Sequence, residues 1–334
     1  MGERTEQKEQ KTSSLCPPLS KAGHGAGKQA EATRDAYGKA LFELGKRKSE
    51  VVVLDADLSG STKTKKFADA FPERFFNLGI AEQDMIGTAG GLSLTGKIPF
   101  ASTFAIFETG RAWEQVRQTI CYSHLNVKLV STHAGITVGE DGASHQALED
   151  IALMRVIPDM TVIVPADGTE TEQVISAVAE YSGPVYVRLG RAKVPAVLPD
   201  DYTFRIGRAY AFHLGKDANI LATGIMVSVA LDARKILEAD GLDVGVVNVS
   251  TIKPLDEDAV LRAAEAKLIV TAEEHSIIGG LGSSVCELLS DRKPMMVKRI
   301  GVRDTFGRSG KPDELMQYYG LTAEEIARTI KTSL

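Results

Sequence analysis

The chain has few cysteines, no long apolar run and no stretch dominated by basic residues. Its three cysteines, Cys16, Cys121 and Cys286, form no CxxC pair among 334 residues. This pattern argues against a disulfide framework and a zinc site, and it predicts free thiols in a reducing compartment. No apolar segment approaches the roughly 20 residues that span a bilayer, and no apolar core follows the charged N-terminus. We therefore expect a soluble, cytoplasmic protein.

The charge balance and the length further limit the kinds of partner and the number of domains that we expect. The formal net charge is -5 and the pI is about 5.8, which argues against nucleic acid as the main partner. With 43% hydrophobic residues in 334, the chain is long enough for two domains that each bury a core.

Several common ligand motifs are absent. The segment GSTKTKK (60–66) lacks the spacing of a phosphate-binding loop, and GGLG (279–282) is too short for a dinucleotide fingerprint. Glu273, Glu274 and His275 have no second histidine at metal-binding spacing. We expect no metal to be held by this chain alone.

Apolar and polar segments alternate along most of the chain. Residues 1–29 are polar and lack apolar periodicity, which predicts a flexible tail. After a helical segment that begins near Glu31, runs rich in β-branched residues alternate with helix-like stretches, and this favours parallel sheets covered on both faces. The predicted strands are VVVLDADL (51–58), RFFNLGI (74–80), KIPFAST (97–103), VKLVSTHAG (127–135), MTVIVPAD (160–167) and PVYVRLGR (184–191).

The segment VPAVLPDDYTF (194–204) has the composition of a linker, and the same rhythm restarts after it. We predict two three-layer α/β domains with largely parallel sheets, over residues 30–198 and 199–334. The strands expected in the second domain are ANILATG (218–224), DVGVVNVST (243–251), AKLIVTAEEH (266–275) and MMVKRIGV (295–302).

Ligands of open parallel sheets bind outside the carboxyl ends of the strands, and polar residues gather at those ends here. The segment 131–150 contains two histidines and three glycines. Glycines allow a loop to approach a ligand closely, and His133 and His145 suit proton handling on sugar hydroxyls. The alternative is a solvated loop in which the histidines are incidental.

Charged residues beside the predicted strands give two further signals. Glu82 begins a helix, where a carboxylate can also serve only to offset the helix dipole. Arg34, Arg188 and Arg191 flank apolar runs, and their planar guanidinium groups suit phosphate. A surface salt bridge is the alternative for each arginine.

Six segments stand out together along the chain: ATR (32–34), DADLSGS (55–61), LGIAEQDM (78–85), STFAIF (102–107), STH…GEDGASHQ (131–146) and PAD (165–167). Through them the chain, from about Ala32 to its end, resembles the C-terminal half of transketolases. The resemblance implies a thiamine-diphosphate-binding pyrimidine domain followed by a transketolase C-terminal-like domain. It also implies transfer of a two-carbon ketol unit from a ketose phosphate to an aldose phosphate.

The resemblance implies a role for residues near the cofactor. Glu82 looks like the glutamate that protonates the aminopyrimidine nitrogen of thiamine diphosphate. Phe104 and Phe107 match aromatic residues that pack on the pyrimidine, while a third aromatic of the family falls near Gly110 and is missing. Asp57 lies where the family places a residue close to the cofactor.

The resemblance also implies substrate contacts. His133 and His145 look like histidines that hydrogen-bond the substrate near the reacting carbons, and Asp141 looks like the acid that binds the C2 hydroxyl of the acceptor aldose. The family's sugar-phosphate anchors match Arg34, Ser61 and Arg191, with Arg188 a less close match.

One part of the family pattern is missing. Transketolases hold Mg²⁺ and the cofactor diphosphate with a GDG motif, and this sequence contains none. The resemblance therefore implies a split enzyme, in which an N-terminal subunit supplies the diphosphate and Mg²⁺ site, in a heterotetramer of two small and two large chains.

Three alternatives remain open. The β subunit of a 2-oxoacid dehydrogenase E1 component has similar length and domains, although its loop usually contains HSQ rather than GEDGxxHQ. A fragment of a 1-deoxyxylulose-5-phosphate synthase is a second possibility, although those enzymes are normally one chain. The third is a non-catalytic interaction subunit, although Glu82, His133 and His145 are all present.

Overall fold

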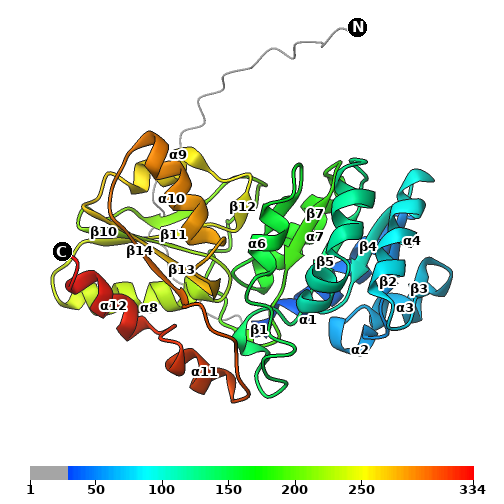
Figure 1. The fold of residues 1–334 in the computed structure, drawn as a ribbon, viewed down its shortest axis with the longest axis horizontal. Helices are drawn as coiled ribbons and strands as arrows, with labels where there is room; N and C mark the ends of the chain where they lie inside the picture. The colour runs from blue at the N-terminus through cyan, green and yellow to red at the C-terminus, as the bar shows by residue number, and fades with distance from the viewer. Residues whose placement is uncertain (1–28) are drawn as a thin grey trace, which may run out of the picture.

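The computed structural model describes residues 29–334, which form two lobes side by side (Figure 1). Each lobe has a central sheet covered by helices, and the predicted α/β fold with largely parallel sheets is confirmed. The predicted flexible tail, residues 1–29, lies outside the described range except for Gln29. Within that range no helix combines the length and the apolar character needed to cross a membrane.

The first lobe is built on seven strands in the order β12-β6-β7-β5-β4-β2-β3. All neighbours are parallel except β12, which is antiparallel to β6. Each predicted run contains one strand, because β-branched side chains fill both faces of a covered sheet. The strands are β2 (Val51–Asp55), β3 (Phe75–Asn77), β4 (Ile98–Ser102), β5 (Lys128–Ser131), β6 (Thr161–Ile163), β7 (Val185–Arg188) and β12 (Thr251–Lys253).

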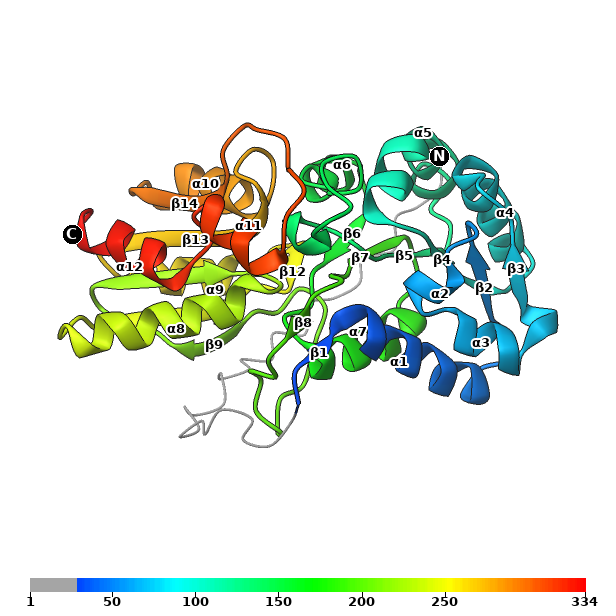
Figure 2. The same cartoon turned by 90° about the horizontal axis from the view of Figure 1, so that it is seen from below.

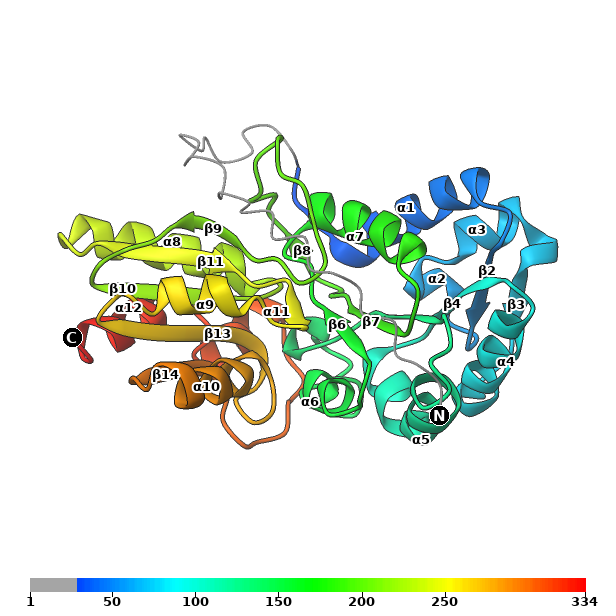
Figure 3. The ribbon, with the colours of Figure 1, turned by 90° about the horizontal axis from the view of Figure 1, so that it is seen from above.

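Helices cover the two faces of this sheet, as Figures 2 and 3 show. One face carries α1 (Thr33–Arg47), α3 (Lys65–Ala70) and α7 (Gly168–Glu180); the other carries α4 (Glu82–Leu94), α5 (Trp113–Gln115) and α6 (Asp150–Arg155). The shorter elements are α2 (Ser59–Thr62), two 3₁₀ turns (Pro72–Arg74 and Ile136–Val138) and two π-helical segments (Phe107–Arg111 and Val116–Cys121).

The second lobe has five strands in the order β14-β13-β10-β11-β9, of which only the edge strand β9 is antiparallel. Helices α8 and α12 pack on one face, and α9 and α10 on the other. The elements are β9 (Tyr210–His213), β10 (Ala218–Ala222), α8 (Met226–Ala239), β11 (Val244–Asn248), α9 (Glu257–Ala263), β13 (Leu268–Ser276), α10 (Leu281–Arg292), β14 (Val297–Val302), α11 (Pro312–Tyr318) and α12 (Ala323–Lys331).

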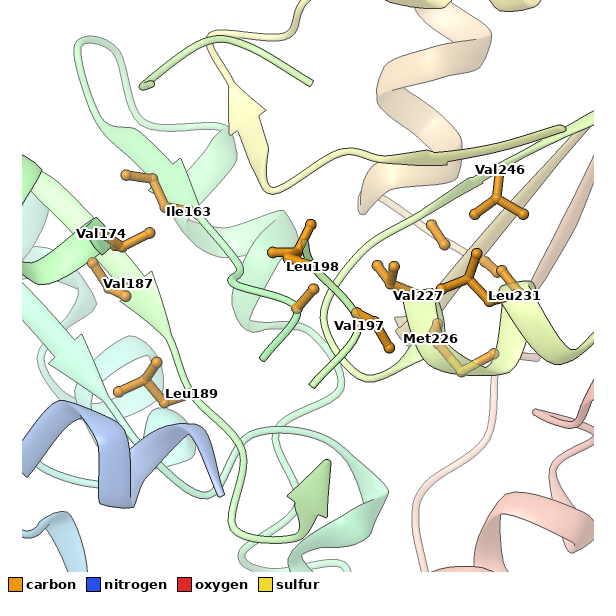
Figure 4. Packing of buried hydrophobic residues seen from close by; sticks show 14 of the residues in the cluster. Ile163, Val174, Val187, Leu189, Val197, Leu198, Met226, Val227, Leu231 and Val246 are labelled. Atoms are coloured by element: carbon orange, nitrogen blue, oxygen red, sulfur yellow. The ribbon is translucent and has the colours of Figure 1, made fainter. Parts of the chain in front are cut away.

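The two lobes are joined by strand pairing and by apolar packing as well as by the segment that connects them. Strand β12 follows β11 along the chain but pairs with β6 of the first lobe. The stretch 194–204, which has the composition of a linker, is packed rather than solvated: Val197 and Leu198 are buried between the cores of the two lobes (Figure 4). Near it, β1 (Glu31–Ala32) pairs with β8 (Lys193–Val194). The domain limits 30–198 and 199–334 remain predictions.

A buried ion pair lies at this junction. The Nε of Arg188 donates to the Asp150 carboxylate at 2.7 Å, and the Tyr186 hydroxyl donates to the same oxygen at 2.7 Å. Arg188 also donates to the backbone carbonyls of Ala147 and Glu274 at 3.3 and 2.9 Å. Although burial raises the pKa of the Asp150 carboxyl, the adjacent Arg188 guanidinium brings that pKa below its ordinary value.

Removing Asp150 should be costly because it leaves the Arg188 charge buried without its partner. We expect Asp150→Ala to lower the free energy of unfolding by about 3–5 kcal/mol. The control is Asp232→Ala on α8, because the side chains of Asp232 and its ion-pair partner Lys235 are 62% and 57% exposed. We expect this change to lower the free energy of unfolding by about 1 kcal/mol or less. Urea unfolding followed by circular dichroism measures both. Equal losses in the two variants would contradict a structural role for the buried pair.

Candidate active site

The predicted site residues gather where the parallel strands end. Phe104 follows β4, His133 follows β5 and Arg191 follows β7, while Glu82 begins α4 shortly after β3. Because the carboxyl ends of parallel strands share one edge of the sheet, side chains that are distant in sequence meet there.

Aromatic rings form the centre of the site. The rings of Phe104 and His133 are stacked, with centroids 3.8 Å apart. Phe107 is stacked on Phe104 at 5.8 Å, and His145 meets Phe107 edge-on at 5.5 Å. The structure therefore brings four predicted residues into one cluster of stacked and edge-on rings.

The hydrogen bonds of His133 fix its tautomer. Arg34 Nη1, a donor, lies 2.9 Å from His133 Nε2, so Nε2 accepts. The other nitrogen, Nδ1, then carries the proton and donates to the Thr132 hydroxyl at 2.8 Å. Burial, together with the positive charge of Arg34, lowers the pKa of His133 to about 3. The ring is thus neutral near pH 7, with one donor and one acceptor in fixed directions.

At one end of the cluster lies the buried carboxylate of Glu82. Arg111 Nη1 is 2.9 Å from it, and the Arg111 guanidinium carbon lies 4.3 Å from the centroid of the Phe107 ring. Arg111 therefore connects the carboxylate to the aromatic cluster. Sequence reasoning missed Arg111, although the missing aromatic near Gly110 pointed to this segment. Gly110 adds no ring there, and its neighbour Arg111 covers Phe107 instead.

A second residue that sequence reasoning missed is Glu108. It is fully buried on the π-helical turn between Phe107 and Arg111, and it accepts a hydrogen bond from the Ser131 hydroxyl. Burial, with smaller contributions from the charges of Asp55 and Glu82, raises its pKa to about 8. Glu108 is therefore mostly protonated at pH 7. Single π-helical turns are frequent at functional sites, but composition does not reveal them.

At the other end of the cluster lie two guanidinium groups. Arg34 Nη1 also donates to the Ser61 carbonyl at 3.2 Å, and Arg191 donates to the Val138 carbonyl at 2.5 Å and lies 3.4 Å from the Asp141 carboxylate. Burial lowers the pKa of Arg34, and the nearby positive charge of Arg191 contributes. Among the described residues, the buried Nε of Arg34 has no hydrogen-bond partner. This end suits an oxyanion.

Two predicted site residues have other surroundings. Arg188 is buried in the junction, where its guanidinium is engaged by Asp150 and two backbone carbonyls. The phosphate role of Arg188 stays a prediction. Asp57 lies in the turn after β2, where its side chain accepts from Asn77 Nδ2 at 3.0 Å. That placement keeps it at the sheet edge without showing a role.

The site thus has three parts with distinct chemistry. A carboxylate linked through Arg111 to stacked phenylalanine rings suits a flat nitrogen heterocycle. Two histidines next to it can donate to and accept from hydroxyl groups. Two guanidinium groups at the far end suit a phosphate or similar anion. Together the parts fit an elongated, hydroxylated anion bound beside a heterocyclic cofactor.

The neutral state of His133 can be tested by NMR of ¹³C-labelled histidine. We expect the His133 ring signals not to titrate between pH 8 and 5, because its pKa is lowered from 6.5 to about 3. The unfolded chain binds this proton more readily, so His133 makes folding less favourable as the pH falls through that interval. Arg34→Met removes an adjacent positive charge and should raise this pKa. A midpoint near 6.5 in the wild type would contradict the assignment; His133→Gln identifies the signal.

Comparison with known proteins identifies the family. The chain matches the family profiles "Transketolase, pyrimidine binding domain" over residues 29–196 and "Transketolase, C-terminal domain" over residues 207–326. It is 53% identical over 300 residues to a protein of Methanocaldococcus jannaschii named as a transketolase C-terminal section, covering 89% of this chain and 94% of that one.

Two further matches agree. A 6-deoxy-6-sulfo-D-fructose transketolase subunit of Clostridium sp. strain MSTE9 is 42% identical, covering 88% of this chain and 92% of that one. A solved structure described as a split-gene transketolase, an inactive β4 tetramer, matches with a TM-score of 0.83 and 52% identity, covering 91% of this chain and 98% of that one. The chain belongs to the transketolase family and comprises its pyrimidine-binding and C-terminal domains.

Proposed function

We propose that the chain is the C-terminal subunit of a split, thiamine-diphosphate-dependent transketolase. Assembled with a second subunit, it transfers a two-carbon ketol unit from a ketose phosphate to an aldose phosphate. The observation that carries this proposal is the chain of contacts from Glu82 through Arg111 and the aromatic cluster to Arg34, near which the Arg191 charge also lies. It connects a cofactor end, a hydroxyl-binding middle and an anion end.

The cofactor end fits the pyrimidine of thiamine diphosphate, on which the family depends. We assign Glu82 to the ring nitrogen and Phe104 and Phe107 to the aromatic face. When bound, the cofactor supplies an electron sink for cleaving a carbon–carbon bond. In this structure Arg111 is paired with Glu82, and its side chain is 53% exposed. Arg111 contacts only Oε1 of Glu82, and we assign the second oxygen, Oε2, to the ring nitrogen.

The middle of the site suits the sugar hydroxyls. His133 is neutral, and its Nε2 lone pair now faces Arg34, so it can accept from a hydroxyl that takes this position. His145 lies on the same aromatic cluster, and we assign it to hydrogen bonds near the reacting carbons. We assign Asp141, beside Arg191, to the C2 hydroxyl of the acceptor.

The anion end sets the substrate class. Arg34, Ser61 and Arg191 would hold the sugar phosphate, since paired guanidinium groups bind oxyanions in fixed geometry. The Clostridium relative is named for a sulfosugar, and a sulfonate is also an oxyanion. The same arginines therefore make phosphorylated and sulfonated ketoses the two donors to compare.

We infer that the chain needs a partner that holds the diphosphate and Mg²⁺. The similar split-gene structure is described as inactive in the form of a β4 tetramer, which supports this inference. Ile80, two residues before Glu82, is 78% exposed, and an apolar side chain at the rim of the cofactor end suits coverage by another chain. We propose a two-plus-two heterotetramer, as in the sequence-based expectation.

The proposal predicts activity only in the assembled enzyme. With xylulose 5-phosphate, ribose 5-phosphate, thiamine diphosphate and Mg²⁺, we expect turnover when this chain is mixed with its candidate N-terminal subunit and none from either alone. Glu82→Gln should lower kcat by about 10²-fold or more, since it removes a proton-transfer group. Glu43→Gln, an exposed change on α1, is the control. Normal turnover by Glu82→Gln would refute the assignment of Glu82.

The anion end makes a separate prediction. We expect Arg191→Ala to raise KM for phosphorylated sugars by about 10-fold or more while lowering kcat less, because the contact exists in ground and transition states alike. Arg117→Ala, at an exposed position, controls for loss of charge. An unchanged KM for phosphorylated sugars in Arg191→Ala would remove this residue from the phosphate site.

A further inference from the structure

Two adjacent carboxylates on β13 of the second lobe have different partners. Glu273 accepts from the backbone N–H groups of Leu281 and Gly282 at 2.7 and 2.8 Å, where α10 begins in its own lobe. Glu274 Oε1 instead accepts from the N–H of Thr137 at 2.7 Å, in the first lobe. Both carboxylates are buried, with 0% and 5% exposure. Successive side chains of a strand point to opposite faces, which explains the division.

Thr137 belongs to the segment that carries the proposed substrate contacts, which we call the substrate loop (residues 133–148). Three glycines with positive φ, Gly135, Gly139 and Gly142, give the loop an irregular backbone. The backbone hydrogen bonds within the loop, such as that from the N–H of Gly142 to the carbonyl of Gly139, do not include the N–H of Thr137, and this buried group needs a partner elsewhere. The 3₁₀ turn Ile136–Val138 obtains one from Glu274.

The same turn is connected to the anion end of the site. Thr137 donates to Glu274, and the carbonyl of the next residue, Val138, accepts from Arg191. Arg191 in turn lies beside Asp141 on the same loop. A displacement of this turn would therefore move the Arg191 and Asp141 side chains together.

The second lobe also forms hydrogen bonds with other residues of the loop. The N–H of Ser276 donates to the Leu148 carbonyl at 2.8 Å, and Gln146 Nε2 donates to the Arg308 carbonyl at 3.0 Å. A Cβ atom added to Gly135 would overlap the Glu274 carboxylate. The carboxylate thus packs against the loop with no spare volume between them.

We propose that Glu274 is a positioning residue of the second lobe, which holds the turn at Thr137 and thereby sets the placement of Asp141, His145 and Arg191 for substrate. This inference rests on the proposed function, since that function assigns the loop to substrate binding. It gives the second lobe a defined part in the active site, in addition to its part in the fold.

The first measurement is hydrogen–deuterium exchange of the chain, which needs no activity. Glu274→Ala should speed exchange in the substrate loop by about 10-fold and leave the start of α10 unchanged. Glu273→Ala, the matched control, should speed exchange at the start of α10 and leave exchange in the substrate loop unchanged. Glu274→Gln keeps an acceptor oxygen, so its rate of exchange in the substrate loop should stay within about twofold of the wild-type rate. Glu274→Met, which fills the space without that oxygen, replaces the alanine variant if the latter does not fold.

The second measurement is kinetics of the assembled enzyme. Glu274→Ala should raise KM for the sugar phosphates by about 10-fold, whereas Glu274→Gln should keep KM near the wild-type value. Glu273→Ala should leave KM unchanged, although it should lower thermal stability about as much as Glu274→Ala does. Loop exchange and KM unchanged in Glu274→Ala, or raised equally by Glu273→Ala, would overturn the proposal. An inactive wild-type assembly would refute the proposed function instead, and the exchange result would still decide whether Glu274 orders the loop.

Discussion

The buried ion pair between Arg188 and Asp150 is the interaction on which the arrangement of the molecule depends. A charge without access to water is tolerated only where its partner and its remaining hydrogen bonds are in place. Arg188 ends β7, Asp150 begins α6, and the same guanidinium binds backbone carbonyls from the substrate loop and from β13. Three segments that are distant in sequence are therefore fixed against one another.

This constraint also explains how the site can hold groups in costly states. His133 has a left-handed backbone, with φ at 58°, and a neutral buried ring. Such features persist where the surroundings determine the local geometry. The Arg188 guanidinium holds the end of the substrate loop through the Ala147 carbonyl, and Glu274 of the second lobe holds its turn at Thr137. A preorganised loop lets binding energy serve orientation of the substrate rather than ordering of the protein.

The fold was largely predictable because its signals are local. Runs such as VVVLD and VYVR fill both faces of a covered parallel sheet, and each contains a strand in the structure. The site residues at strand ends were also predictable, since parallel strands bring their carboxyl ends to one edge. His133, His145, Phe104 and Phe107 meet there as one cluster.

The features that the sequence could not predict depend on the direction in which side chains point and on long-range pairing, and residue type reveals neither. Arg188 and Arg191 are three residues apart, yet the first points into the junction and the second to the anion end. The π-helical turn at Phe107–Arg111 changes the direction of Glu108 and Arg111 without a compositional signal. Pairing of β12 with the other lobe's sheet is a long-range event that no local pattern encodes.

Strand β12 has a consequence for how such a chain can be divided between genes. The stretch 194–204 has the composition of a natural break point, but a cut there would separate β6 from β12 and remove Val197 and Leu198 from one of the two cores. The fragments would carry a bare strand edge and exposed apolar surface, both of which promote aggregation. These contacts favour inheritance of the two lobes as a single unit.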